Sequence, residues 1–237
     1  MTYLYRALTW GNLLVLLVVF ALLLRGSLRK YWIVFLYVSW ELLSNVGLAI
    51  FDATYGGSAV GPFVTQDARI LYARLYWSND VMVDVLRFVL VIVLTYRAVD
   101  AGAKRVQVGR LLALVMTVVF VLPFLVFPMG NNAWPKGAWF NSTSELLNFG
   151  AAIMNLILWG ALLSNRRRDN QLAAVSVGLG IVVTGAAFSY GVRHFLPVDS
   201  TAIPNLFLML SQLAGWTIWC RAFWPASEPR RVNALAR

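Results

Sequence analysis

Three charged side chains lie inside a stretch of the chain that is otherwise apolar. Asp80, Asp84 and Arg87 occur in the segment YWSNDVMVDVLRFVLVIVLTY at spacings of four and three residues. These spacings place all three residues on one face of a helix. A single Asp or Arg at the centre of a bilayer costs roughly 2.5–3.5 kcal/mol. We therefore expect this face to point toward other helices or water, with Arg87 paired to Asp84 one turn away.

A second polar stripe lies in the segment SWELLSNVGLAIFD. Glu41 and Asn45 are four residues apart in it and share one helix face. If the two segments cross a membrane in opposite directions, Glu41 and Arg87 lie at about the same depth. The sequence therefore predicts a buried contact between Glu41 and Arg87.

These stripes, with amides and aromatic rings from other segments, predict one cavity open to the outer face. Its expected lining is Glu41, Asn45, Asp80, Asp84, Arg87, Asn148, Asn155 and Gln212, with aromatic walls from Tyr37, Trp40, Trp77, Tyr190 and Trp216. Such a site suits a small amphiphilic or zwitterionic molecule. Asp84 would hold a cationic group, and Arg87 an anionic group unless Glu41 occupies it. Two structural alternatives stay open: the amides can serve as interhelical hydrogen bonds, and the charges as an ion-pair network.

The composition is that of a membrane protein. Of the 237 residues, 60% are hydrophobic and 13% are charged, and the mean hydropathy is +0.70. A soluble domain is about 45–50% apolar. The net charge of +10 comes from basic residues in short turns between apolar runs, where Lys and Arg set membrane topology and contact anionic lipid. The pattern does not favour nucleic-acid binding.

Seven stretches are long enough to cross a bilayer, which takes about 20 apolar residues. They lie near 6–24, 31–51, 77–97, 109–128, 144–164, 172–194 and 204–224. Most Lys and Arg residues fall in every second connection and after the last stretch, so the positive-inside rule places the N-terminus outside and the C-terminus in the cytoplasm. The expected fold is an all-α integral membrane bundle of seven helices in one domain, 1–225, with a short basic tail, 226–237.

Seven helices with an outer N-terminus resemble the rhodopsins and the G-protein-coupled receptors in topology. Microbial rhodopsins carry a retinal-linked lysine in the seventh helix, whereas the lysines here, Lys30, Lys104 and Lys136, all fall in expected loops. Covalent retinal is therefore excluded, while a non-covalent apolar ligand is not. The seven-helix sugar transporters share this topology too, but their Pro-Gln motif does not occur in this chain.

The start of the third stretch resembles a group of small bacterial seven-helix membrane proteins. In that group the third helix opens with Tyr-x-x-x-Tyr-Trp followed by an acid three residues on, and the matching residues here are Tyr72, Tyr76, Trp77 and Asp80. The resemblance implies a bacterial inner-membrane protein. It implies no activity.

The function that this pattern favours is a ligand-binding or sensory module that would signal through a protein partner at its basic cytoplasmic face. The alternatives are a small secondary transporter or proton-coupled permease, and a structural subunit of a larger membrane complex. An enzyme is not favoured, because the sequence carries no HExxH, GxSxG or P-loop motif. One histidine, His194, and one cysteine, Cys220, leave no histidine-rich or thiolate metal site. No cofactor is expected.

Overall fold

The chain folds into seven long α-helices and a short π-helical turn. The computed structural model describes residues 2–54, 66–99, 103–127, 137–164, 169–193, 195 and 202–225. The elements are α1 (Thr2–Leu22), η1 (Leu23–Ser27), α2 (Trp32–Thr54), α3 (Gln66–Ala98), α4 (Ala103–Val126), α5 (Gly137–Ser164), α6 (Asn170–Arg193) and α7 (Ala202–Phe223). The expected tail 226–237 and His194 lie outside the described residues.

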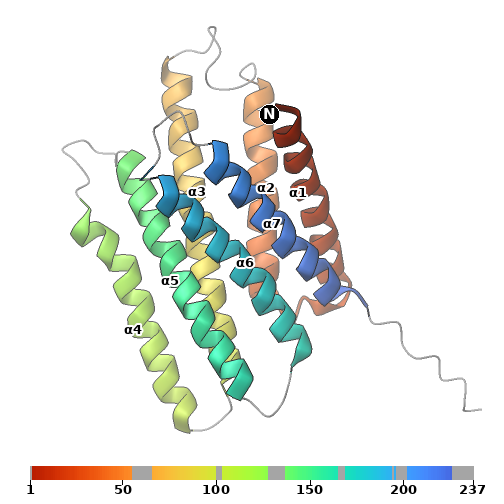
Figure 1. Cartoon of the computed structure of the whole chain (residues 1–237), viewed down its shortest axis with the longest axis vertical. Coiled ribbons are helices and arrows are strands. Elements are labelled where there is room, and N and C mark those ends of the chain that lie inside the picture. The colour runs from red at the N-terminus through yellow and green to blue at the C-terminus, as the bar shows by residue number, and fades with distance from the viewer. Residues whose placement is uncertain are drawn as a thin grey trace, which may run out of the picture.

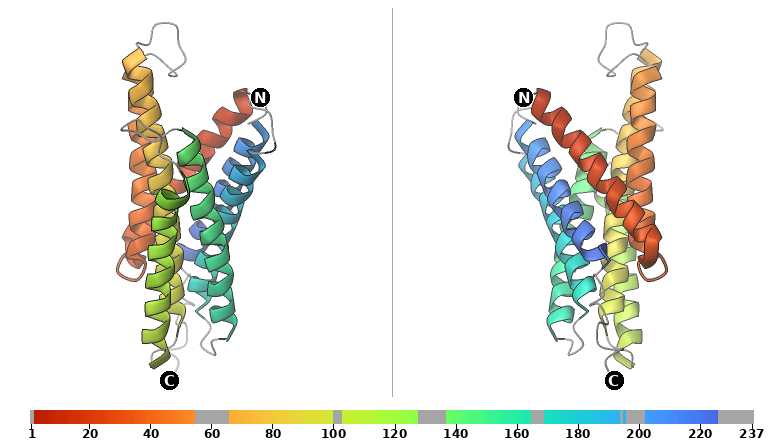
Figure 2. Two further views of the ribbon diagram at one scale, coloured as in Figure 1. Left: turned by 90° about the vertical axis from the view of Figure 1, so that its left-hand side faces the viewer. Right: turned by 90° about the vertical axis from the view of Figure 1, so that its right-hand side faces the viewer.

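The helices form one bundle whose edges are α4 and α1 (Figure 1). Between these edges, α3 packs against α2 and α5, while α6 packs against α5 and α7. The side views show α6 and α7 together, inclined relative to the upright pair α2 and α3 (Figure 2). Helix α1 closes the bundle by packing on α7 and α2. This arrangement brings the polar faces of α2 and α3 to the interior, opposite α7.

Six of the seven long helices are long and apolar enough to cross a membrane, which identifies a multi-pass helical membrane protein by length and composition. Helix α3 is not among the six. Its apolar half contains Asp80, Asp84 and Arg87, and its other half is more polar still. Large apolar side chains also cover the outside of the bundle, as expected for a surface that faces lipid.

Three helices begin well before the expected spans. Helix α3 begins at Gln66 rather than near 77, α4 at Ala103 rather than near 109, and α5 at Gly137 rather than near 144. In each case the added residues include polar ones, which lower the hydropathy on which the expected spans were based. A long helix can extend past the hydrocarbon region because backbone hydrogen bonding does not depend on apolar side chains.

Helices α6 and α7 approach each other closely at glycine. A Cβ placed on Gly178 would collide with the Trp219 ring and lie 2.9 Å from the Gly215 carbonyl oxygen. A Cβ on Gly215 would collide with Val182 and lie 2.8 Å from the Gly178 carbonyl oxygen. Small residues permit this kind of backbone contact between membrane helices, where dispersion forces and weak hydrogen bonds replace the hydrophobic effect. The pair α6–α7 is therefore a tightly joined unit.

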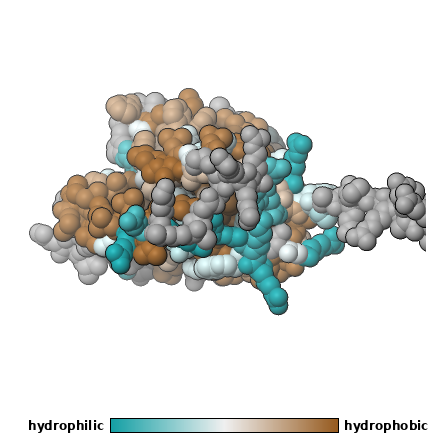
Figure 3. All heavy atoms as spheres, turned by 90° about the horizontal axis from the view of Figure 1, so that it is seen from below, coloured by the Kyte–Doolittle hydropathy of each residue, from teal (hydrophilic) through white to brown (hydrophobic). Residues whose placement is uncertain are grey.

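At the end of the bundle opposite the start of α1, hydrophilic side chains project from a largely hydrophobic surface (Figure 3). Here Asp169 caps α6 by accepting a hydrogen bond from the Leu172 amide at 3.0 Å, and Lys30 Nζ lies 3.0 Å from its carboxylate. Burial opposes ionisation of Asp169, but these two hydrogen bonds outweigh it and lower the pKa of the carboxyl. The ion pair is exposed and contributes little, whereas the cap defines where α6 begins.

The contact between α6 and α7 predicts how stability responds to one added methyl group. Gly178→Ala is expected to destabilise the protein by about 1–3 kcal/mol, because the new Cβ overlaps Trp219 and the α7 backbone. Thermal unfolding of the purified protein in detergent measures the effect. The matched control is Gly160→Ala on α5, where an added Cβ meets nothing within 4 Å. Equal melting temperatures for the two variants would contradict this account of the α6–α7 contact.

Candidate functional site

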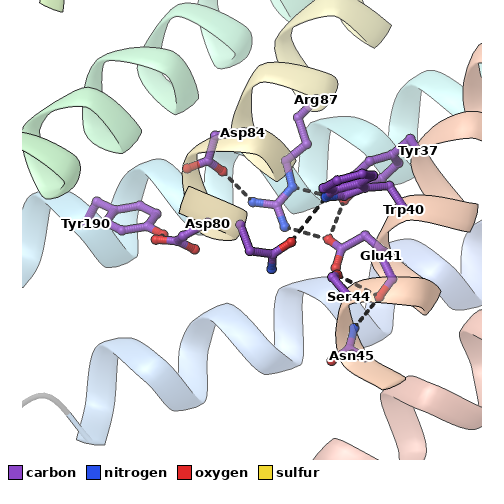
Figure 4. A network of polar contacts seen from close by, with 10 residues as sticks. Tyr37, Trp40, Glu41, Ser44, Asn45, Asp80, Asp84, Arg87 and Tyr190 are labelled. Atoms are coloured by element: carbon purple, nitrogen blue, oxygen red, sulfur yellow. Dashed lines mark hydrogen bonds and ion pairs between the residues drawn. The ribbon is translucent and has the colours of Figure 1, made fainter. Parts of the chain in front are cut away.

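The guanidinium of Arg87 is the centre of a buried polar network between α2 and α3 (Figure 4). Its Nη1 donates to Asp84 Oδ1 at 2.8 Å, its Nη2 to Glu41 Oε1 at 3.1 Å, and its Nε to the Tyr37 hydroxyl at 2.9 Å. Arg87 is 3% exposed, Asp84 1% and Glu41 8%. Both expected ion pairs, Arg87 with Glu41 and Arg87 with Asp84, are confirmed. Two carboxylates therefore surround one guanidinium, which leaves one excess negative charge.

Tyr37 connects this network to α7. Its hydroxyl accepts from Arg87 and donates to Glu41 Oε1 at 3.1 Å. Its ring stacks on Trp216 with the centroids 5.5 Å apart and meets Trp219 edge-on at 6.0 Å. Tyr37 lies one turn before Glu41, so the helix places both groups on the face that meets Arg87. The network is thereby fixed from three helices, α2, α3 and α7.

The second oxygen of Asp84 faces α5. Ser144 and Asn148 lie beside the carboxylate. Asp84 Oδ2, Ser144 Oγ and Asn148 Oδ1 are all buried and have no hydrogen-bond partner among the described residues. A small rotation of the Ser144 hydroxyl would let it donate to one of the other two unpaired oxygens, Asp84 Oδ2 or Asn148 Oδ1, since a hydroxyl hydrogen is free to turn. The α5 side of the network is thus polar and close-packed, and it is not part of the cavity described below.

Asp80 belongs to a separate pair. The Tyr190 hydroxyl of α6 donates to Asp80 Oδ2 at 2.5 Å. Arg193 lies over the Tyr190 ring, 4.7 Å from its centroid, and donates to Asn205 of α7 at 2.7 Å. Asp80 and Asp84 therefore share a face of α3 but meet different helices.

A polar cavity of about 210 Å³ lies between α1, α2 and α7, in the half of the bundle where α1 begins. It is lined by Thr9, Asn12, Leu13, Leu16, Glu41, Asn45, Met209, Gln212 and Trp216. Thr9 and Asn45 are exposed, so the cavity opens at the surface between α1 and α2. Glu41 is the one residue that belongs both to this cavity and to the Arg87 network.

The expected single cavity is divided into separate sites. Of the predicted lining, only Glu41, Asn45, Gln212 and Trp216 line the cavity between α1, α2 and α7. Tyr37, Asp84 and Arg87 form the network behind Glu41, and Asp80 and Tyr190 form the pair toward α6. The reason is that residues on one face of α3 reach different neighbouring helices: Arg87 meets α2, whereas Asp80 meets α6.

The remaining predicted residues also lie elsewhere. Asn155 accepts a hydrogen bond from Ser176 at 3.3 Å and joins α5 to α6. Trp77 stacks on Phe140 of α5 with the centroids 6.1 Å apart. The Trp40 indole donates to Asn79 at 3.1 Å and lines an apolar groove between α2 and α3. These three residues thus make contacts between helices and do not line the cavity. For Asn155 this is the structural alternative stated in the sequence analysis, an amide that forms an interhelical hydrogen bond.

The sequence did not predict the contribution of α1. Asn12 donates to the Met209 carbonyl of α7 at 3.2 Å, and it lines the cavity with Thr9 and Leu13. The available signal was the spacing of Thr9 and Asn12, which places two polar groups on nearly one face of a helix that is otherwise apolar. The other faces of α1 are apolar and outward, since Trp10, Leu14 and Leu17 are exposed.

Comparison with known proteins identifies no relative: no family model, curated protein or solved structure matches the chain.

The network predicts an asymmetric response to removing charges. Arg87→Leu is expected to destabilise the protein by about 3–5 kcal/mol, because it leaves Glu41 and Asp84 buried without their cation. Adding Glu41→Gln and Asp84→Asn to this variant should restore most of the loss, since no uncompensated charge remains. Thermal unfolding in detergent measures both variants. A triple variant no more stable than Arg87→Leu alone would contradict the charge-compensation argument.

Proposed function

We propose that this protein is a seven-span ligand-binding module, with its N-terminus outside and its C-terminus in the cytoplasm, that takes up a small molecule in the cavity between α1, α2 and α7. The observation that carries the proposal is the meeting of this cavity with the buried ion-pair network at Glu41. Pockets with apolar walls and a few converging polar groups are typical ligand sites. At about 210 Å³ the cavity is smaller than the roughly 300–1,000 Å³ of drug-sized pockets, so the ligand is small.

A connection from the cavity to the rest of the bundle supports a sensory role. Glu41 is held by Arg87 and Tyr37, and Tyr37 is stacked on Trp216. A ligand that bonds to Glu41 competes with these contacts and so changes how α2, α3 and α7 are held together. A ligand shifts a conformational equilibrium only through contacts that differ between the states. The Arg87 network provides such contacts.

The proposed orientation places the cavity in the outer half of the membrane. Arg25, Arg97 and Arg221, in the last turns of η1, α3 and α7, lie at the end of the bundle opposite the start of α1, whereas Arg193 of α6 lies at the other end. That distribution favours a cytoplasmic location for this end. The ligand would then enter from the outside, and a protein partner would bind at the basic cytoplasmic face.

Ligand binding is tested by thermal stability in detergent against pools of small polar compounds. At least one compound at about ten times its Kd should raise the Tm by about 3–6 °C. Asn45→Trp, which places a large ring at the cavity mouth, should abolish that rise. Leu43→Trp is the matched control on the same helix, because Leu43 is 67% exposed and does not line the cavity. If the compound still raises the Tm of Asn45→Trp, the ligand binds elsewhere. Flux of the compound into proteoliposomes would favour a transporter.

The orientation is tested with single cysteines, because Cys220 is the only cysteine in the chain. In a Cys220→Ser background, Tyr3→Cys should react with a membrane-impermeant maleimide on intact cells. Arg29→Cys should react only after the cells are permeabilised. Both positions are exposed and lie toward opposite ends of the bundle. The reverse pattern would overturn the proposed topology.

A further inference from the structure

The charge inside the bundle is unbalanced next to the cavity. Arg87 is shared by Asp84 and Glu41, so these three groups carry one excess negative charge when all are ionised. An unpaired charge in a low-dielectric interior is costly, and either a bound proton or a counter-ion relieves that cost. Asp80 also lies within electrostatic reach of two guanidiniums, Arg87 and Arg193. Counted together, the three carboxylates of Glu41, Asp80 and Asp84 and these two guanidiniums still leave one excess negative charge when all are ionised.

Glu41 is the member of this group that the cavity reaches. Its Oε1 accepts both hydrogen bonds, from Arg87 and Tyr37, while Oε2 accepts none from the described part of the chain. The other walls add no charge: α1 contributes Thr9 and Asn12, and α7 contributes Gln212. A molecule in the cavity therefore meets the carboxylate of a residue that is only 8% exposed.

Neutral oxygen acceptors surround the same space. Asn12 Oδ1 is buried and has no hydrogen-bond partner among the described residues. Gln212 also lines the cavity and makes no hydrogen bond within the described part of the chain. Buried polar atoms in proteins are almost always paired. An ammonium group in the cavity has N–H donors for Glu41 Oε2 and the Gln212 amide oxygen, and for Asn12 Oδ1 once the Asn12 side chain turns toward the cavity.

An anion does not fit this site. All three nitrogens of Arg87 are already engaged by Asp84, Glu41 and Tyr37. An anion deep in the cavity would face the carboxylate of Glu41, and the guanidinium behind it is already shared by two carboxylates. The zwitterion expected from the sequence is therefore disfavoured, because the half of its site that would bind the anionic group is occupied.

We propose that the cavity binds a small organic cation, a protonated amine, whose ammonium group pairs with Glu41 Oε2 and donates to Asn12 and Gln212. This inference rests on the proposed ligand-binding function and names its ligand class. A bare metal ion would leave most of the roughly 210 Å³ unfilled. An alkylammonium ion fills more of it and meets Trp216 at the wall, where an indole ring attracts ammonium ions.

The test compares cations at constant ionic strength, using the full chain in detergent. Methylammonium, butylammonium and ethanolammonium chloride are titrated against sodium chloride and N-methylglucamine chloride. At least one of the three amines should raise the Tm by about 3–6 °C at about ten times its Kd, whereas sodium and the bulkier N-methylglucamine should not. An equal rise with sodium, or no rise with any of the three amines, overturns the proposal.

Two variants locate the effect. Glu41→Gln should abolish the amine-dependent rise, and Gln212→Leu should weaken the apparent affinity about tenfold without disturbing the Arg87 network, to which Gln212 does not belong. Asp169→Asn, which removes a carboxylate at the other end of the bundle, should leave the rise unchanged. If Glu41→Gln does not fold, Gln212→Leu alone decides, and an unchanged affinity in it overturns the proposal. A neutral or anionic compound whose effect is blocked by Asn45→Trp would overturn the cation inference and leave the ligand-binding function standing.

Discussion

The need to compensate charge away from water is the constraint on which this bundle depends. A guanidinium carries five N–H donors in a fixed plane, and Arg87 directs three of them to two carboxylates and a phenol on two helices. Each partner restricts how α2 and α3 can slide or rotate relative to each other. The hydrophobic effect cannot provide this restriction among lipid-facing helices, because lipid tails are as apolar as the side chains. The geometry of these hydrogen bonds therefore determines the register between α2 and α3, and close packing at glycine sets the distance between α6 and α7.

The same constraint connects the interior with the cavity. Glu41 satisfies Arg87 on one side and faces the space between α1, α2 and α7 on the other. Any change to Glu41 at the cavity therefore also changes its ion pair with Arg87, and a change to the ion pair also changes the cavity. This distinguishes Glu41 from Asp84, which is enclosed on all sides, and from Asp80, whose partner is Tyr190 on α6.

The sequence was sufficient to predict most helices and the central ion pairs. Spacing alone placed Asp84 and Arg87 on one face and put Glu41 at the same depth, because helix periodicity and membrane depth are both local properties. It was not sufficient to predict which stripe meets which helix. Asn155 and Trp77 have the composition of cavity residues, but neighbouring helices pair them with Ser176 and Phe140. Helix neighbours are set by the packing of the whole bundle, and no spacing within a single helix contains that information.

The glycine contact between α6 and α7 also limits how the cavity between α1, α2 and α7 can change shape. One wall of the cavity is α7, and the α7 backbone already touches α6 at Gly178 and Gly215. That wall has no room to move toward α6. For the ligand proposed above, a bulkier guest would have to displace α1 or α2 outward, so the surrounding bilayer as well as the protein would govern the size of ligand that the cavity accepts.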